Sequence, residues 1–344
     1  MDLTLTSEQD DLEHAVTRML ATAPDAWAGL AEMGLLGLGV PEADGGAGGT
    51  FADVFVVARA LGRAGARTPY VEGVVGGHLL PGPAERLVVL AHDEPGRRWH
   101  AGAGVRAEPE PEPTGGTWRL TGTKEPVLHG AAADLLVVSA TGPEGLGLFV
   151  VDPADAAIHP YFSHDRSPTA RIDLDRTPAT LLAAPPRADE LLTAASVRAV
   201  TAYGAEALGA MEDALGRTVA YLRTRHQFGV PLASFQALTH RAADAYVALE
   251  LARSAVLYAT ACLAEDVVDP AVASRLKVQT GRAGRLIGQE AIQLHGGIGM
   301  TDEHAIGYAT ARLEVIEHLW GDTGFHLQRL AAGLGDHGAV ELLR

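Results

Sequence analysis

Helical periodicity dominates the chain from about residue 188 to its end, and only three short stretches interrupt it. These stretches contain Gly or Pro and lie at residues 229–231, 269–270 and 296–297. Proline disrupts a helix interior, and glycine favours a helix end. The pattern predicts four long helices, at about residues 188–225, 234–265, 270–295 and 305–334. Long helices with short links pack as an antiparallel bundle.

The preceding half of the chain has two different patterns. Residues 1–88 are predicted to be helical, with Ser7 and Asp10 spaced as a capping box. Short apolar runs punctuated by Gly and Pro then predict β-strands up to about residue 182. The Pro-rich tract at 108–113 is expected to be an exposed connection, since Pro donates no ladder hydrogen bond. We therefore predict an α+β protein with a helical domain at 1–88, a β-barrel or sheet domain at 89–184 and a four-helix bundle at 185–344.

Composition narrows the classes of function. Hydrophobic residues make up 47% of the chain and aromatic residues 5%, which favours helices packed through small side chains. The net charge of −16 disfavours broad nucleic-acid binding. One cysteine, Cys262, excludes internal disulfides and Cys/His zinc cages, and we predict no metal site. Because we recognise no membrane-spanning run and no signal peptide, we expect a cytoplasmic protein that has no membrane partner.

The first segment with chemical potential is Arg223–Gln236, in the first interhelical link. It joins a cationic helix end, a glycine stop and a new helix start. A helix N-terminus with a nearby Arg and Gln suits a phosphate or an adenine edge. From the spacing alone, an ordinary turn with a solvated Arg is the simpler interpretation.

The second segment is Gln293–Thr301, at the end of the third predicted bundle helix. Glycines at positions 296, 297 and 299 would let backbone N–H groups approach an anion without a side-chain clash. A helix C-cap that needs positive φ explains the same glycines. Each segment alone is therefore weak evidence for a binding site.

Together, the two segments resemble the acyl-CoA dehydrogenase family. Its C-terminal bundle carries R-x-Q-F-G-x-P-L-x-x-F-Q, here from Arg225 to Gln236, and Q-L-H-G-G-x-G, here from Gln293 to Gly299. Residues 34–46 resemble the family's first domain. Residues 118–124, with Ala133-Asp134, resemble its β domain. The resemblance covers almost the whole chain and preserves the α–β–α order.

The resemblance implies FAD bound at an interface between subunits, an acyl-CoA substrate and a dimer of dimers. It also implies that reduced flavin passes electrons to an electron-transfer flavoprotein. One end of the bundle would hold the diphosphate and adenine end of FAD. The residues implied in this contact are Arg225, Gln227, Phe228, Gln236, Gln293, Gly296 and Gly297.

The catalytic base is where the chain departs from the family pattern. Dehydrogenation of an acyl-CoA needs a carboxylate that removes the α-proton while hydride leaves the β-carbon for the flavin. Many relatives carry this Glu in a Tyr-Glu-Gly-Thr segment. Here the corresponding stretch, His318–Gly324, holds Trp320 and Gly321 at the centre, and neither can abstract a proton. Asp322 is the nearest acid, with a shorter reach.

A second family position for the base falls near Ala199 or Val200, which are not acids. Glu206 lies two turns further along the same helix. Flanked by Ala and Gly, it would have a raised pKa if it were partly buried. The alternative, which we favour slightly, is a solvated or salt-bridged residue on a helix face.

Two further departures concern the first two domains. The N-terminal domain is short between Leu20 and Trp27. The stretch from His92 to Gly115 lacks the Thr/Ser loop that usually cradles the flavin ring. Residues 97–100 (Arg97, Arg98, Trp99 and His100) stand there instead, either as solvated loop residues or as an entry-side anion contact.

These departures favour one hypothesis among four. Some family members are heterotetramers in which one chain supplies the base and the flavin-ring cradle, and a shorter chain supplies the opposite half of the cofactor site. This chain resembles the shorter partner, whose complexes act on bulky acyl-CoAs such as steroid side chains. The alternatives are a self-sufficient dehydrogenase with Asp322 or Glu206 as base, a flavin-free scaffold, and a flavin oxidase or monooxygenase relative.

Overall fold

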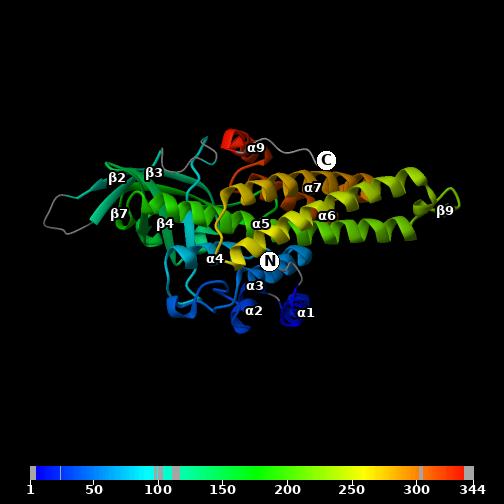
Figure 1. Ribbon diagram of the computed structural model, residues 1–344, viewed down its shortest axis with the longest axis horizontal. Helices are drawn as coiled ribbons and strands as arrows, with labels where there is room; N and C mark the ends of the chain where they lie inside the picture. The colour runs from blue at the N-terminus through cyan, green and yellow to red at the C-terminus, as the bar shows by residue number, and fades with distance from the viewer. Residues whose placement is uncertain are drawn as a thin grey trace.

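The computed structural model describes residues 5–23, 25–96, 99, 104–110, 117–301 and 305–336. Figure 1 shows an elongated molecule with three parts. A β-structure lies at one end, long helices run from it to the other end, and the N-terminal helices pack along one side. The predicted order of helical, β and helical parts, and the α+β class, are confirmed.

The N-terminal part contains four helices, and the third is the most buried. They are α1 (Ser7–Thr22), α2 (Ala26–Glu32), α3 (Phe51–Ala64) and α4 (Tyr70–Leu79). The predicted capping box at Ser7 and Asp10 is wrong by one residue. Thr6 is the N-cap. Its hydroxyl accepts from the Gln9 backbone N–H, and the Gln9 side-chain oxygen accepts from the Thr6 backbone N–H. Gln can take the Glu position of such a box because its amide oxygen accepts the same bond.

The middle part is a barrel with two strands outside the ring. Strands β4, β2, β3, β7 and β5 pair in that order, and β4 also pairs with β5, which closes the ring. Closure leaves these strands no free edge. Strand β1 extends the sheet in parallel with β4, and β6 pairs antiparallel with β7. The strands are β1 (Val88–Ala91), β2 (Arg106–Pro109), β3 (Thr117–Leu128), β4 (Leu135–Gly142), β5 (Gly145–Val151), β6 (Ala157–Phe162) and β7 (Pro168–Ala183).

The Pro-rich tract differs in part from the prediction. Glu108 and Pro109 form the end of β2 and pair with β3 opposite Arg119 and Trp118. Proline is tolerated because it is the last residue of the strand. Residues 111–116 lie outside the described residues.

The C-terminal bundle contains α5 (Arg187–Thr224), α6 (Gln236–Ala264), α7 (Pro270–His295), α8 (Ala305–His318) and α9 (Thr323–Ala332). Asp269 caps α7 and Pro270 opens it, as predicted. The prediction of one fourth helix up to residue 334 is wrong, because the chain breaks between α8 and α9. Trp320 and Gly321 have φ of 60° and 105° there, which no helix continues through.

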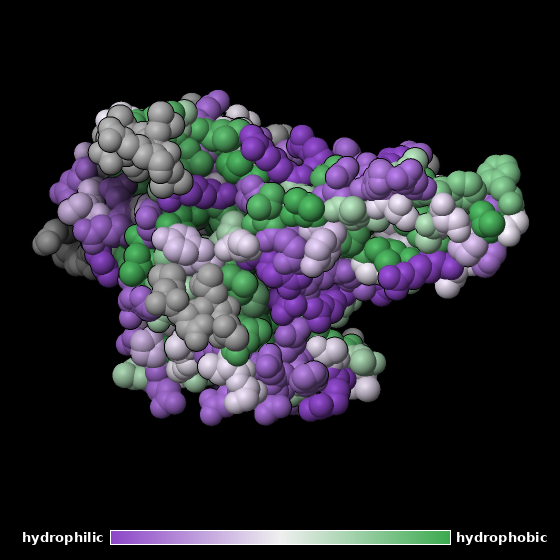
Figure 2. Space-filling model, turned by 45° about the vertical axis from the view of Figure 1, so that its right-hand side comes forward, coloured by the Kyte–Doolittle hydropathy of each residue, from purple (hydrophilic) through white to green (hydrophobic). Residues whose placement is uncertain are grey.

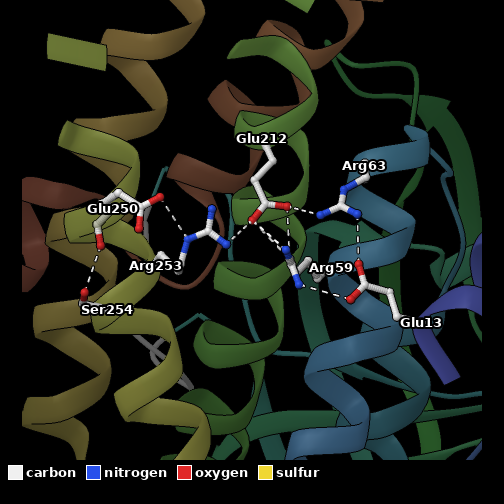
Figure 3. A network of polar contacts seen from close by, with 7 residues as sticks. All are labelled: Glu13, Arg59, Arg63, Glu212, Glu250, Arg253 and Ser254. Carbon is white, nitrogen blue, oxygen red and sulfur yellow. Dashed lines mark hydrogen bonds and ion pairs between the residues drawn. The ribbon is translucent and has the colours of Figure 1, made fainter. Parts of the chain in front are cut away.

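Charged side chains join the N-terminal part to the bundle (Figure 3). Glu212 of α5, whose side chain is 9% exposed, accepts from Arg59 and Arg63 of α3 and pairs with Arg253 of α6. Glu13 of α1 pairs with the same two arginines of α3. A carboxylate removed from water needs such donors, because unpaired burial of a charge is costly. The network therefore fixes four helices relative to one another.

Helix α6 carries an exposed apolar face. Among the described residues it is the one helix long and apolar enough to cross a membrane. Its most apolar part has a mean hydropathy of 1.5, and 39% of that part is buried. This differs from the expectation that no apolar run reaches that length. Figure 2 shows apolar patches interrupting the polar surface along the bundle. The large exposed side chains on α6 are Tyr246, Val247, Leu251 and Tyr258.

Candidate functional site: an open bundle end and a filled interior

The segment from Arg225 to Gln236 forms the tip of the bundle. It turns through a hairpin of two short strands, β8 (His226–Gln227) and β9 (Val230–Pro231), before α6 begins. Phe228 and Gly229 form the turn with φ of 54° and 82°. The Phe228 side chain is 90% exposed, so the hairpin presents an aromatic ring to solvent or to a partner.

The Gly-rich segment lies at the same end of the molecule. The ring of Tyr221, near the end of α5, stacks on His295, the last residue of α7, with centroids 4.5 Å apart. His295 is 5% exposed, and so it acts in packing rather than as a free ligand. The two segments, which are far apart in sequence, therefore meet at one bundle end, the end bearing β9 in Figure 1.

This bundle end is an open surface. A Cβ built at Gly296 or Gly297 would meet no atom within 4 Å, and Gly296 has a φ of 66°. The room above these glycines fits a ligand that lies directly on the backbone. All seven residues that the resemblance implies for FAD are exposed: Arg225, Gln227, Phe228, Gln236, Gln293, Gly296 and Gly297. This end would therefore contact a dinucleotide from one side only.

The predicted base positions are different, because they are packed: Gly321 and Ala199 are buried and Trp320 is half-buried. The Trp320 indole stacks on the His92 ring, with centroids 3.8 Å apart and planes 22° apart. The Trp99 indole N–H donates to the His318 carbonyl at 2.9 Å, and its ring lies 5.5 Å from that of Phe325. We call His92, Trp99, Trp320 and Phe325 the aromatic plug.

The backbone around Gly321 leaves no room for an acid. A Cβ at this position would lie 2.5 Å from Phe325 Cδ1 and 2.7 Å from His326 Nε2. A φ of 105° is also unfavourable for any residue with a side chain. The loop to which the resemblance assigns the base therefore requires glycine at position 321, in addition to lacking a glutamate.

Two buried side chains hold this loop in place. Lys277 of α7 donates from Nζ to the carbonyls of Ile316 and, at 2.7 Å, Leu319, and so ends α8. Burial lowers the pKa of Lys277 to about 8. His326 bonds Ser274 Oγ and the Trp320 carbonyl, each at 3.0 Å, and burial lowers its pKa to about 4. A neutral His326 donates from Nε2 to the Trp320 carbonyl and fixes its unusual backbone.

The barrel side of the plug is fixed by a buried ion pair. Lys124, fully buried, donates to Glu94 at 2.8 Å, to Ser139 and to the His92 carbonyl. Glu94 also accepts from the backbone N–H groups of Gly104 and Val105. These bonds place His92 against Trp320. Of the four loop residues predicted in this region, Trp99 belongs to the plug, while Arg97, Arg98 and His100 lie outside the described residues.

Cavities lie on both sides of the plug. His92 and Trp320 line one of about 280 Å³, towards α9, and one of about 40 Å³, towards α4. The smaller cavity also contains Ala199, at the second predicted base position. Ala199 and Trp320, one residue from each predicted base position, therefore face the same small interior space.

Glu72 is the acid that sequence reasoning missed in this space. It lines the small cavity from α4, and the Tyr203 hydroxyl donates to it. Burial raises the pKa of the Glu72 carboxyl. Its signal in the sequence was a single acid within an apolar helix, which did not indicate a site by itself.

The two candidate bases named from the sequence are both engaged elsewhere. Glu206 accepts from Arg312 Nε at 2.6 Å and Nη2 at 3.0 Å in a buried ion pair. Asp322 accepts from the Phe325 backbone N–H at 2.8 Å as the N-cap of α9. Asp322 is not among the residues that line either cavity of the plug. The salt-bridged alternative for Glu206 matches these contacts.

The comparisons with known proteins agree on one family. The family model described as acyl-CoA dehydrogenase, C-terminal domain, matches residues 198–335, and that of the N-terminal domain matches residues 7–80. Among similar proteins, IpdE2 of Mycolicibacterium smegmatis, an acyl-CoA dehydrogenase, is 32% identical over 92% of this chain and 90% of its own length. FadE34 of Mycobacterium tuberculosis is 31% identical over 90% of this chain, which spans only 42% of FadE34.

Solved structures of two-component proteins have similar folds. A variant of the Tcur3481-Tcur3483 steroid acyl-CoA dehydrogenase (ACAD) matches with a TM-score of 0.85 and 31% identity. The match covers 97% of this chain and 99% of that one. The ChsE4-ChsE5 complex of Mycobacterium tuberculosis matches with a TM-score of 0.86 and 25% identity, covering 98% and 100%.

Proposed function

Because this chain belongs to the acyl-CoA dehydrogenase family, whose cofactor is FAD, we propose that it is one of two different subunits of a cytoplasmic acyl-CoA dehydrogenase. In this proposal it supplies the bundle end of an FAD site shared between chains. The longer partner chain supplies the catalytic base and the flavin-ring pocket.

The aromatic plug is the observation that carries the proposal. The resemblance assigns the flavin-ring loop to the stretch after His92 and the base to the stretch around Trp320. These two stretches meet in a ring stack of 3.8 Å. Close-packed interiors do not admit a ligand without displacing such rings. An isoalloxazine ring could therefore lie between these two stretches only if the stacked rings of His92 and Trp320 moved apart.

The bundle end supports the other half of the proposal. Arg225 would bind the FAD diphosphate, since guanidinium groups form charge-assisted hydrogen bonds with phosphate. Gln236 and Gln293 offer amide groups to an adenine edge, and the exposed Gly296–Gly297 backbone leaves room for the ligand. When bound, FAD accepts the hydride that leaves the β-carbon of the acyl group. This chain's own residues would bind and orient the cofactor and move no substrate proton.

The substrate and the electron acceptor are proposed from similarity. The similar steroid ACAD and the ChsE4-ChsE5 complex pair two chains, and we propose the same arrangement here. A bulky acyl-CoA, such as one with a steroid side chain, is the proposed substrate class. We propose an electron-transfer flavoprotein as the acceptor of the flavin's electrons.

The test is to express the chain alone and together with a longer acyl-CoA dehydrogenase-like chain that has a Glu at a base position. The visible spectrum is recorded before and after acyl-CoA is added. We expect a colourless chain alone and a yellow complex that acyl-CoA bleaches.

A yellow homo-oligomer that acyl-CoA bleaches would overturn the proposal in favour of a self-sufficient enzyme. Absence of flavin from both preparations would overturn it in favour of a scaffold. Oxygen consumption that depends on substrate and needs no added acceptor would instead indicate an oxidase or monooxygenase.

A further inference from the structure

The outer face of α6 is apolar, although the bundle leaves it uncovered. Val247, Leu251 and Tyr258 follow one another at helical spacing, and each is between 48% and 58% exposed. The opposite face of the helix is apolar as well and packs in the core, through Leu249 and Val256 among others. A surface helix normally has a polar outer face, whereas a helix that is apolar all round is buried. A further surface is therefore expected to cover α6.

The shape and size of this face suit another helix. Between the large side chains of Leu251 and Tyr258 lie the small ones of Ser254 and Ala255, and such a hollow accepts the ridge of a second helix. With 29 residues, α6 is about 43 Å long. Because α7 lies beside it (Figure 1), the two helices present roughly 800 Å². That is the area that one partner contributes to a specific protein interface.

Helix α7 adds positive charge beside this apolar stripe. Arg275 and Arg282 are exposed and two turns apart, and neither has an ion pair or hydrogen bond within the described part of the chain. Arg241 near the start of α6 pairs with Glu290 near the end of α7, so the two helices are antiparallel. Equal steps along both helices from this pair place Arg275 beside Tyr258. The C-terminal half of the stripe is therefore flanked by cations.

The N-terminal half of the stripe carries the opposite charge. Asp244 lies nearly one turn before Val247 and is exposed, and it too has no ion pair or hydrogen bond to a described residue. A face with an acid at one end and cations at the other is complementary to itself. Two such faces attract each other when their α6 helices are antiparallel and repel when they are parallel.

We propose that this face binds the same face of a second copy of this chain, around a two-fold axis. Antiparallel packing of two α6 helices places the N-terminal half of one against the C-terminal half of the other. Asp244 of each copy then meets Arg275 of the other, and the apolar side chains of both copies leave water. We call this surface the α6–α7 face, and its residues are Asp244, Val247, Leu251, Tyr258, Arg275 and Arg282. It includes no residue of the plug or the bundle end, so the proposal does not rest on the proposed function.

Sedimentation velocity of the full chain over a range of concentrations tests the contact without reading flavin. We expect a wild-type dimer, and a dissociation constant at least about tenfold higher for Leu251→Glu, because two carboxylates would be buried without partners. Leu334→Glu is the matched control. It changes a leucine that is 67% exposed, follows α9 and lies outside the face, so this variant should dimerise like the wild type. A wild-type monomer would overturn the proposal, and its flotation with lipid vesicles would identify a membrane as the occupant instead.

Reversing the charges at the rim tests the antiparallel arrangement. Asp244→Arg and Arg275→Asp should each weaken the dimer about three- to tenfold, because like charges would then face each other. The double variant should regain most of the affinity, since the pair forms again with its polarity reversed. Additive losses in the double variant would show that these side chains do not meet and would overturn the antiparallel contact.

Cross-linking in the complex with the longer chain identifies what covers the face. Ser254→Cys places a thiol near the centre of the apolar stripe, where the two-fold axis brings both copies together, while the native Cys262 stays buried. A short bis-maleimide should link two copies of this chain. A link to the longer chain, or no link, would overturn the proposal. The flavin content of the same sample tests the proposed function separately.

Discussion

The bundle end and the aromatic plug are the two places where the resemblance assigns cofactor contacts, and they are built in opposite ways. At the bundle end, Phe228 is 90% exposed and a Cβ at Gly296 or Gly297 would meet nothing. At the plug, two rings stack at 3.8 Å and Gly321 tolerates no Cβ. The chain therefore leaves a contact surface open at the bundle end, whereas its own side chains occupy the contact position at the plug. This difference is what the proposal of one half of a shared site predicts.

The largest effect is expected from putting the family's acid into the plug. Gly321→Glu places a side chain 2.5 Å from Phe325 on a backbone that disfavours it, so the free energy of unfolding should fall by about 3 kcal/mol or more. Urea unfolding measures the change. Gly333→Ala is the control, because its Cβ would meet backbone only at 3.7 Å. A stable Gly321→Glu chain would show that the interior can accept a base.

Removing the indole tests whether the plug packs as tightly as the distances indicate. Trp320→Ala should lower the free energy of unfolding by about 2 kcal/mol, because a large, half-buried ring that stacks on His92 is lost. It should also join the cavities of 280 Å³ and 40 Å³. Flavin absorbance of the purified chain provides the second measurement. If the variant alone became yellow, the plug would be the sole barrier to the flavin ring.

The bundle end is tested in the complex with the partner chain. Arg225→Ala should weaken FAD binding about ten- to a hundredfold, because a charge-assisted bond to phosphate is lost. Fluorescence titration of the deflavinated complex measures the affinity, with Arg187→Ala as the control. Unchanged affinity would show that the diphosphate binds elsewhere, and the bundle end would then not be a cofactor contact.

The loop behind the plug should respond to acid. The pKa of His326 is lowered to about 4 in the folded chain, against an ordinary value of about 6.5. The unfolded chain therefore binds more protons between these values, and stability falls as the pH falls. The wild type should lose about 2 kcal/mol more than His326→Gln between pH 7 and pH 5. Equal losses in urea unfolding would contradict a neutral, buried His326.

The smallest effect is expected at Asp322. Asp322→Ala removes an N-cap and should cost about 1 kcal/mol, whereas Asp322→Asn keeps a capping oxygen and should cost little. Neither variant should slow the bleaching of flavin by acyl-CoA in the complex. Slow bleaching with Asp322→Asn at unchanged stability would instead identify Asp322 as the base.

Some of the fold followed from the residues alone. The breaks at Gly229-Pro231 and Asp269-Pro270 predicted where α5 and α6 end, since glycine and proline act on the local backbone. The break between α8 and α9 was not predicted. It depends on Lys277, which lies 39 and 42 positions before the two residues whose carbonyls it binds, Ile316 and Leu319. The residues around the break do not show that a distant lysine binds their carbonyl groups.

The candidate site divides in the same way. The sequence by itself determined that two motifs at the ends of bundle helices are present and that the usual acid is missing, because residue identity is all that these statements require. Only the tertiary structure decided that the motifs meet on an open surface, that His92 covers Trp320, and that Glu72 lies beside Ala199. Whether a position is open or filled depends on which distant side chains pack against it.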